Sequence, residues 1–196
     1  MLRTGLAILI AASLAVPALA QDCDTFSGLA TPRFVTLKGD DAIGRTGPSL
    51  QHPAQWRYRR AGLPVLIVAE TPLWRRVEDP DGAQVWMHHA LLTGRRSVIA
   101  RIGTDLRARA DADANLIARI EPGAILSLER CRAGWCRMSA GGRRGWAEAG
   151  AFWGVYADEA GASGALEGAQ DPCYRSLPEP AALAARDATA PDGPAR

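Results

Sequence analysis

The chain contains an internal repeat of about sixty residues. The stretch GLPVLIVAETPLWRRV at 62–77 returns sixty-one positions later as GAILSLERCRAGWCRM at 123–138, with Gly, Trp and Arg at the same three places. Farther along, Trp86 aligns with Trp146 after deletion of a single residue. A unit of this length is too long for one turn of a solenoid and suits a small β-barrel or β-sandwich. The sequence therefore predicts two copies of one small module.

Short apolar runs bounded by turn-forming residues predict that both modules are all-β. Neither module shows a helical period beyond a single 3₁₀ turn, expected near 90–92 and near 149–152. With about five short strands each, the modules leave few unpaired edges if each sheet closes into a small barrel. The expected strands are Phe34–Leu37, Val65–Ala69, Trp74–Val77 and Val85–Met87, followed by Val98–Arg101, Ile125–Leu128, Trp135–Met138 and Gly145–Ala147.

The two ends of the chain differ from the modules in composition. Residues 1–20 combine Arg3, an apolar run and small residues ending at Ala20, which is the layout of a cleaved secretory signal peptide. The apolar run is too short for a permanent span, so we expect a periplasmic or secreted protein with no stable membrane insertion after cleavage. A polar lead at 21–33 precedes modules at 34–96 and 97–156, and the low-complexity tail at 157–196 is expected to be mostly disordered.

Cys131 and Cys136 are predicted to form a disulfide bond across a hairpin. An even number of cysteines in an exported chain favours disulfides. These two flank a four-residue connection that contains a glycine, so they can face one another. The aligned residues of the first module are Glu70 and Arg75, an oppositely charged pair suited to the same cross-strand place.

The two remaining cysteines, Cys23 and Cys173, would then join the lead to the tail. A bond that closes so long a loop stabilises by roughly 5 kcal/mol in the chain-entropy model. A zinc site is the alternative use of the four cysteines. It is disfavoured because no CxxC pair or nearby histidine completes a tetrahedral ligand set.

The charge balance argues against nucleic acid as a partner. The net charge is +2, and Lys38 is the only lysine. Binding to nucleic acid or to an anionic membrane surface calls for clustered basic side chains. So weak an excess of positive charge does not imply either partner.

Several short motifs resemble the bacterial SH3-like domains of exported proteins. They are Ile43-Gly44-Arg45-Thr46-Gly47-Pro48-Ser49, Ala61–Val65, Trp74–Val77, Asp81-Gly82, Trp86-Met87-His88 and Leu91–Arg96, then Leu106–Arg109, Gly123, Trp135–Arg137, Gly145-Trp146 and Phe152–Gly154. The likeness covers residues 33–156 and is close to a proteobacterial group with two such domains. It implies two tandem SH3-like β-barrels that bind cell-wall peptides or partner proteins and have no catalytic activity of their own. The chain departs from the family's N-V-R-x-G-P-S turn at Gly44, and residues 109–112 of the second module lack the Gly-Pro.

Arg45, Trp56 and Tyr58 are the candidate ligand-binding residues. Aromatic and arginine side chains alternate in QWRYRR at 55–60, so an extended segment would place both rings on one face. Such side chains are frequent anchors of interfaces, and Arg45 would supply a guanidinium for a peptide carboxylate. Alternatively, the two rings cap the barrel. The tryptophans that recur in both modules, Trp74, Trp86, Trp135 and Trp146, are assigned to packing in the core or at the barrel rim.

The adjacent histidines His88 and His89 suggest a copper or zinc site. Adjacent residues of a strand point to opposite faces, so the two imidazoles would not share one ion, and only His52 remains to contribute. We therefore expect no metal and no cofactor. No catalytic set is expected either, because each cysteine is assigned to a disulfide and the Ser and Asp residues follow no nucleophile motif.

Three functional hypotheses follow from the sequence. The favoured one is a non-catalytic periplasmic binding module that recognises peptidoglycan stem peptide or a wall-associated protein. The second is a structural scaffold for envelope assembly or stress that binds no small ligand. The least favoured is a cell-wall hydrolase, which would require a free cysteine within hydrogen-bond reach of a histidine.

Overall fold

The computed structural model describes residues 25–161. The signal peptide expected at 1–20, the Cys23–Cys173 bond and the tail after residue 161 lie outside the described residues. Within residues 25–161, no helix is long and apolar enough to cross a membrane.

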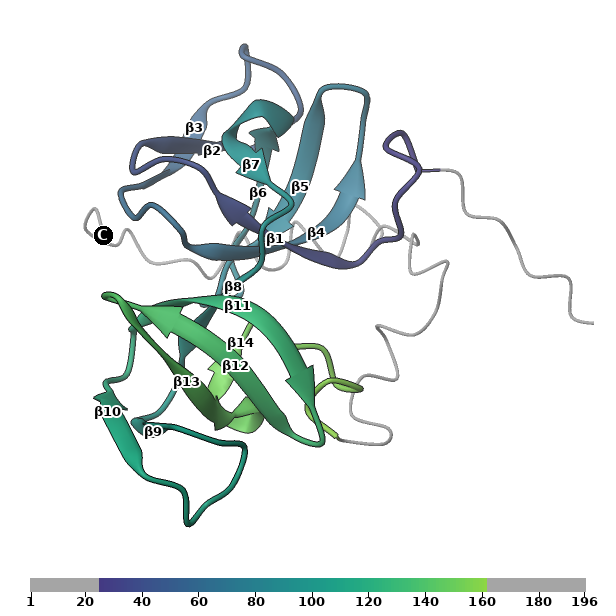
Figure 1. Cartoon of the computed structure of the whole chain (residues 1–196). Helices are drawn as coiled ribbons and strands as arrows, with labels where there is room; N and C mark the ends of the chain where they lie inside the picture. Colours follow the sequence, from purple (N-terminus) through teal and green to yellow (C-terminus); the bar gives the residue numbers. More distant parts are fainter. Residues whose placement is uncertain (1–24, 162–196) are drawn as a thin grey trace, which may run out of the picture.

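Two antiparallel sheets of seven strands form the fold, one from each module (Figure 1). The strand order is β3-β2-β6-β5-β4-β1-β7 in the first sheet, and the second repeats it as β10-β9-β13-β12-β11-β8-β14. The first sheet contains β1 (Arg33–Leu37), β2 (Ala42–Arg45), β3 (Ala54–Tyr58), β4 (Pro64–Glu70), β5 (Trp74–Glu78), β6 (Gln84–His88) and β7 (Leu92–Thr93). The second contains β8 (Ser97–Ala100), β9 (Thr104–Arg107), β10 (Leu116–Ile120), β11 (Ile125–Arg132), β12 (Trp135–Ala140), β13 (Arg143–Glu148) and β14 (Phe152–Trp153). The expected all-β fold of two tandem modules is confirmed.

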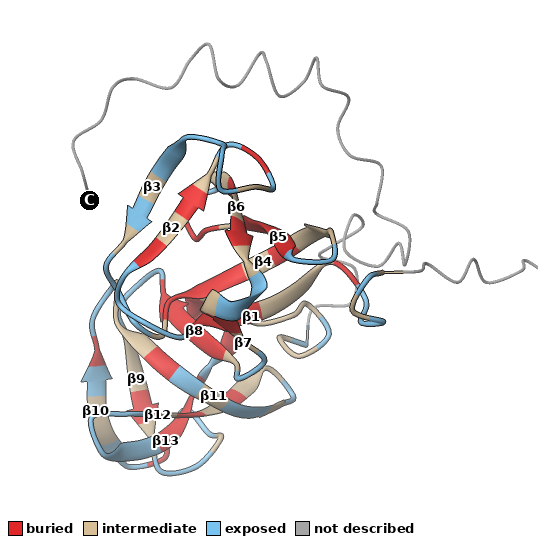
Figure 2. Ribbon diagram, turned by 90° about the horizontal axis from the view of Figure 1, so that it is seen from above, coloured by how far each residue is buried: buried red, intermediate tan, exposed pale blue. Residues whose placement is uncertain are grey.

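Seven strands per module exceed the five or so that were expected. The additional strands are β2 and β3 and their counterparts β9 and β10, which were not expected as separate strands. These strands form a hairpin around a long loop, and most of β3 is exposed (Figure 2). The alternation at 55–60 indicated an extended segment there, but not its pairing with β2. The two expected 3₁₀ turns are present as η1 (His89–Leu91) and η2 (Ala149–Ala151).

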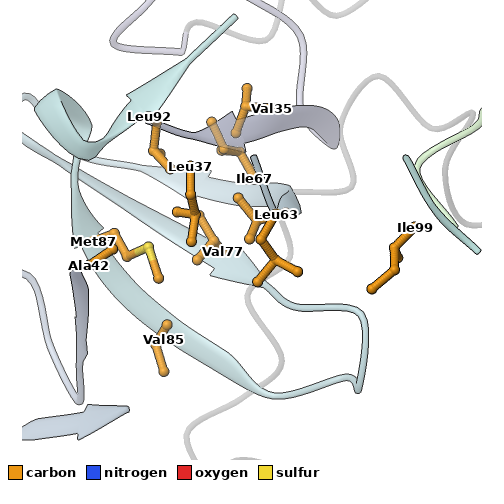
Figure 3. Packing of buried hydrophobic residues seen from close by; sticks show 11 residues of the cluster. Val35, Leu37, Ala42, Leu63, Ile67, Val77, Val85, Met87, Leu92 and Ile99 are labelled. Carbon is orange, nitrogen blue, oxygen red and sulfur yellow. The ribbon is translucent and has the colours of Figure 1, made fainter. Parts of the chain in front are cut away.

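Each sheet curls around its own apolar core. Alternation along β6 sets the core face of the first module, because Val85 and Met87 are buried while Trp86 between them is only partly buried. The first core consists of Val35, Leu37, Ala42, Leu63, Val65, Ile67, Val77, Val85, Met87 and Leu92, together with Ile99 from the second module (Figure 3). The second core consists of Val98, Ala100, Leu106, Ile120, Leu126, Cys136, Met138, Ala147, Ala149, Ala151 and Phe152.

The outer face of β1 packs against the second module. Phe34 meets the ring of Trp153 edge-on, with 5.0 Å between ring centroids, and its backbone N–H donates to Tyr156 Oη at 2.9 Å. Two residues along, Thr36 Oγ1 lies 2.7 Å from Ser97 Oγ, and both residues are buried. Rings and hydrogen bonds between residues so far apart in the sequence join the modules into one packed unit.

The chain segments that flank the two sheets are also fastened to them. Ser27 N donates to Glu70 Oε2 at 3.1 Å in the lead. Residues 157–161, which the sequence analysis assigned to the disordered tail, are folded. Glu159 there forms an ion pair with Arg96 at 2.6 Å, and the Arg96 guanidinium lies 4.5 Å from the centre of the Tyr156 ring.

Candidate functional site

Trp56 and Tyr58 lie on the side of β3 that faces the core. The register pairs Trp56 with Gly44 and Tyr58 with Ala42, and Ala42 is buried in the first core. Both rings are partly buried and pack against that core. Burial and the nearby Asp79 carboxylate, which accepts a 3.0 Å hydrogen bond from Tyr58 Oη, raise the pKa of Tyr58. The rings thus occupy the positions of barrel caps, and ligand binding by them stays a prediction.

Arg45 lies on the opposite face of the same hairpin. A Cβ on the preceding residue, Gly44, would point into the core, so the side chain of Arg45 points outward. Arg45 pairs with Trp86, which lies on the outer face of β6. The sequence predicted that Arg45 shares a surface with Trp56 and Tyr58. In the structure Arg45 and the two rings lie on different faces.

Arg45 and its counterpart Arg107 fasten the long loop of each module. Arg45 Nη1 donates to the carbonyl oxygen of His52 at 2.8 Å, and Arg107 Nη1 donates to that of Ala114 at 2.9 Å. Both hydrogen bonds span seven residues. The second loop therefore keeps the geometry of the first although residues 109–112 lack its Gly-Pro. A structural role explains the arginine in both modules.

The recurring tryptophans lie on the outer faces of the sheets, where Trp74 and Trp146 are nevertheless buried. Trp146 follows core-facing Gly145, and the guanidinium groups of Arg130 and Arg132 lie over its ring at 5.5 and 4.5 Å. Trp74 meets the His88 ring edge-on at 5.6 Å. The burial of Trp74 and Trp146 agrees with the packing role, in the core or at the barrel rim, that their recurrence predicted.

The adjacent histidines lie side by side and do not point apart as expected. The ring centroids of His88 and His89 are 4.6 Å apart at an interplanar angle of 30°. Strand alternation fails here because β6 ends at His88 and His89 begins the 3₁₀ helix. His88 Nδ1 accepts a hydrogen bond from Ala90 N at 3.2 Å. No group of three or more His, Cys, Asp or Glu that could hold a metal ion occurs within residues 25–161.

The expected disulfide bond between Cys131 and Cys136 is confirmed. It joins paired residues of β11 and β12, so neither of the two described cysteines is a free thiol. In the first module Glu70 and Arg75 form the matching pair, with 3.4 Å between Oε1 and Nε, and Arg33 forms a second ion pair with Glu70. The Glu70 side chain is only 2% exposed, so it depends on these partners. The second module joins the two strands of this hairpin by a disulfide bond, and the first joins them by an ion pair.

A concave surface of 470 Å³ on the second module is a candidate ligand site that the sequence analysis missed. Trp135 lies in its wall beside Glu148, with which it is paired across β12 and β13. In the first module His88 stands in place of Glu148, and its ring covers Trp74, which is 8% exposed. Without such a cover Trp135 stays partly exposed. The second module has glutamate, Glu148, at the position where the first has His88, and this difference is the sequence signal that could have revealed the site.

Charged side chains of both signs surround Trp135. Asp105 and Arg107 form an ion pair at 2.7 Å inside the concave surface. Arg119, Glu121 and Glu148 are exposed there, and no hydrogen bond or ion pair from the described part of the chain engages their charged groups. The surface can therefore pair with an ammonium group and a carboxylate at the same time.

Comparisons with known proteins place the chain in a family. The model of the bacterial SH3 domain matches it twice, over residues 38–94 and 103–154. No curated protein matches it significantly. Two solved structures are similar to it: NlpC2 from Trichomonas vaginalis, at 12% identity and a TM-score of 0.30, and NlpC1 from the same organism, at 11% identity and a TM-score of 0.29. The alignments cover 64% and 63% of this chain but only 49% and 46% of those two chains, so this chain spans about half their length. The two segments matched by the family model make up more than half of the chain and coincide with the two sheets, so the chain belongs to the bacterial SH3 domain family and contains two copies of the domain.

Proposed function

We propose that the chain is a non-catalytic binding protein of the bacterial cell envelope that recognises the stem peptide of peptidoglycan. Bacterial SH3 domains are binding domains, and two of them account for both sheets. The Cys131–Cys136 disulfide is compatible with a location outside the cytoplasm, as the signal peptide expected at 1–20 requires.

The concave surface around Trp135 is the observation that carries this proposal. Its volume of 470 Å³ lies in the range of roughly 300 to 1,000 Å³ that is common for ligand pockets. The partly exposed ring supplies apolar contact, while Arg119 and Glu148 supply opposite charges. A short peptide with both carboxylate and ammonium groups matches that lining.

A structural scaffold without a small ligand is the second candidate. The interface between the modules supports it, because Phe34, Thr36 and Ile99 fix one module against the other. A scaffold would use that rigidity to hold a partner protein and would not need the concave surface. The two candidates therefore differ in whether substitutions around Trp135 affect binding.

Cosedimentation with purified peptidoglycan tests the proposal. The chain from Gln21 onward would be compared with Trp135→Ala and Arg119→Ala, with Arg109→Ala as the control for loss of an exposed arginine elsewhere on the same module. We expect Trp135→Ala to weaken binding by about thirtyfold and Arg119→Ala by about fivefold, since buried aromatic anchors contribute most of the binding energy. Thermal melting shows whether each variant is folded. Equal binding by all four folded proteins would contradict the proposed site.

A further inference from the structure

A cleft of 560 Å³ lies between the two modules. Its walls come from β1 and β7 of the first module and from β8, β11 and β12 of the second. Three cationic side chains line it, and its lining among the described residues contains no Asp, no Glu and no aromatic ring. The cleft is therefore polar and positively charged.

Five hydroxyl side chains form a continuous row along this cleft. The row runs from Thr93 through Thr36, Ser97 and Ser127 to Ser139. Three of its four steps are paired positions on neighbouring strands, which lie about 4.8 Å apart. The fourth step crosses between the modules through the 2.7 Å contact of Thr36 Oγ1 with Ser97 Oγ. One line of hydroxyl groups thus spans five strands and both domains.

Strand alternation explains why all five hydroxyls point away from the cores. Each of them follows or precedes a core residue on its own strand, as Thr36 does Leu37 and Ser97 does Val98. The same holds for Ser127, which follows buried Leu126. The row is therefore an outer-face feature of both sheets, brought together by the packing of the modules.

The centre of the row is fixed and its end is open. Ser97 Oγ donates to the carbonyl oxygen of Gly62 at 2.7 Å, so the single hydroxyl hydrogen of Ser97 is used and Thr36 must donate to Ser97. Within residues 25–161, by contrast, no hydrogen bond engages the side-chain hydroxyls of Ser127 and Ser139. Ser127 is exposed and Ser139 partly so. These two hydroxyls can both donate to a ligand and accept from it.

Positive charge borders the row. Arg95 is exposed, and the described residues provide no partner for its guanidinium. Lys38 Nζ donates to the carbonyl oxygen of Ala90 at 2.9 Å and retains two further hydrogens. Arg96 is already paired with Glu159, so Arg95 and Lys38 carry the charge that is free to meet an anion.

We propose that this cleft binds a saccharide that carries a phosphate or carboxylate group. Serine hydroxyls at regular spacing can exchange hydrogen bonds with the hydroxyls of a sugar, and Arg95 can pair with its anionic substituent. An aromatic platform for neutral sugars is missing from the described lining, so the affinity depends on the anionic group and the hydroxyl contacts together. This site goes beyond the proposed function, because its residues and its ligand class differ from those of the concave surface around Trp135.

NMR titration of the chain from Gln21 onward tests the proposal with defined probes. The probes are N-acetylglucosamine 1-phosphate and N-acetylmuramic acid, with neutral N-acetylglucosamine and inorganic phosphate as comparisons. We expect both anionic sugars to shift the amide signals of Arg95, Ser127 and Ser139, and to bind at least about tenfold more tightly than either comparison probe. A preference for the phosphate or the carboxylate sugar identifies the source of the anion.

Matched variants complete the test. The double substitution Ser127→Ala, Ser139→Ala removes both free hydroxyls and should weaken the binding of both anionic sugars by about tenfold, as should Arg95→Ala. Arg109→Ala removes an exposed arginine outside the cleft and should change nothing. Binding of inorganic phosphate as tightly as of the sugar phosphate would overturn the saccharide assignment. Unchanged cleft signals at millimolar probe would overturn the site itself, while leaving the peptidoglycan test of Trp135 unaffected.

Discussion

Gly44 lies so close to Val85 that a Cβ on Gly44 would meet Val85 Cγ2 at 2.5 Å. In the second module the large residue and the glycine occupy the opposite strands of this contact. Leu106 stands where the first module has Gly44, and Gly145 stands where it has Val85, so a Cβ on Gly145 would meet Leu106 Cγ at 2.7 Å. Each core thus combines one large and one absent side chain at the same contact, as close packing requires. Val85 across the sheet explains why Gly44 departs from the family's turn pattern.

Gly44→Ala should therefore destabilise the first module by about 1 to 3 kcal/mol, because the added methyl group overpacks a filled core. Urea unfolding measures the loss. The double variant Gly44→Ala, Val85→Ala should lose less free energy of unfolding than the sum of the losses in the two single variants. Gly94→Ala is the control, since a Cβ there meets nothing within 4 Å. Full additivity of the two changes would show that they do not share this contact.

The repeat predicted two modules, and short apolar runs predicted that they are all-β. The Cys131–Cys136 bond was also predictable, because it depends only on the local geometry of one hairpin. β3 was harder to assign, because the alternation of QWRYRR at 55–60 suits an extended loop as well as a strand, and its partner β2 lies across a long loop. Recurrence showed that Trp74 and Trp146 belong to the fold, but not that they lie on its outer faces. The packing of the modules could not be predicted, because Phe34 and Tyr156 meet across 122 residues and no local pattern encodes such a contact.

Removing the disulfide should weaken the second module. Substituting both Cys131 and Cys136 by alanine is expected to cost at least about 2 kcal/mol, the chain-entropy value for so short a loop, because Cys136 also packs in the second core. Urea unfolding of the variant measures the cost, and an unchanged midpoint would show that the bond adds nothing.

Mass spectrometry of unreduced tryptic peptides tests the second expected bond, Cys23–Cys173, and a peptide joining Cys23 to Cys131 would contradict the pairing.

The Arg96–Glu159 pair should make stability depend on pH in the acid range. Burial alone would raise the pKa of Glu159, but the hydrogen bonds from Arg96 and from Tyr156 N outweigh it and hold the pKa below its ordinary 4.5. A lowered folded-state pKa stabilises the fold above 4.5, and this contribution disappears as the pH falls through the folded pKa. Thermal melting should therefore show a larger difference between the wild type and Glu159→Gln at pH 7 than at pH 3, because the contribution shrinks as the pH falls below 4.5. An equal gap at both pH values would exclude ionisation as the cause.

Trp56→Ala separates packing from recognition in the first module. Because the ring packs against the core, we expect the substitution to lower the free energy of unfolding by about 3 kcal/mol. Trp56→Phe, which keeps an aromatic ring, should lose far less. Unchanged stability of Trp56→Ala with weakened peptidoglycan binding would instead support the ligand-binding role predicted from the sequence.

An NMR titration with a peptidoglycan stem peptide tests the proposed site most directly. The six tryptophans give six indole N–H signals, one for each ring. We predict that the Trp135 signal shifts saturably with added peptide, because its ring lies in the concave surface. The Trp56 signal should stay in place, because its Nε1 is buried. A saturable shift of Trp56 with Trp135 unchanged would contradict the account and move the peptide site to the first module.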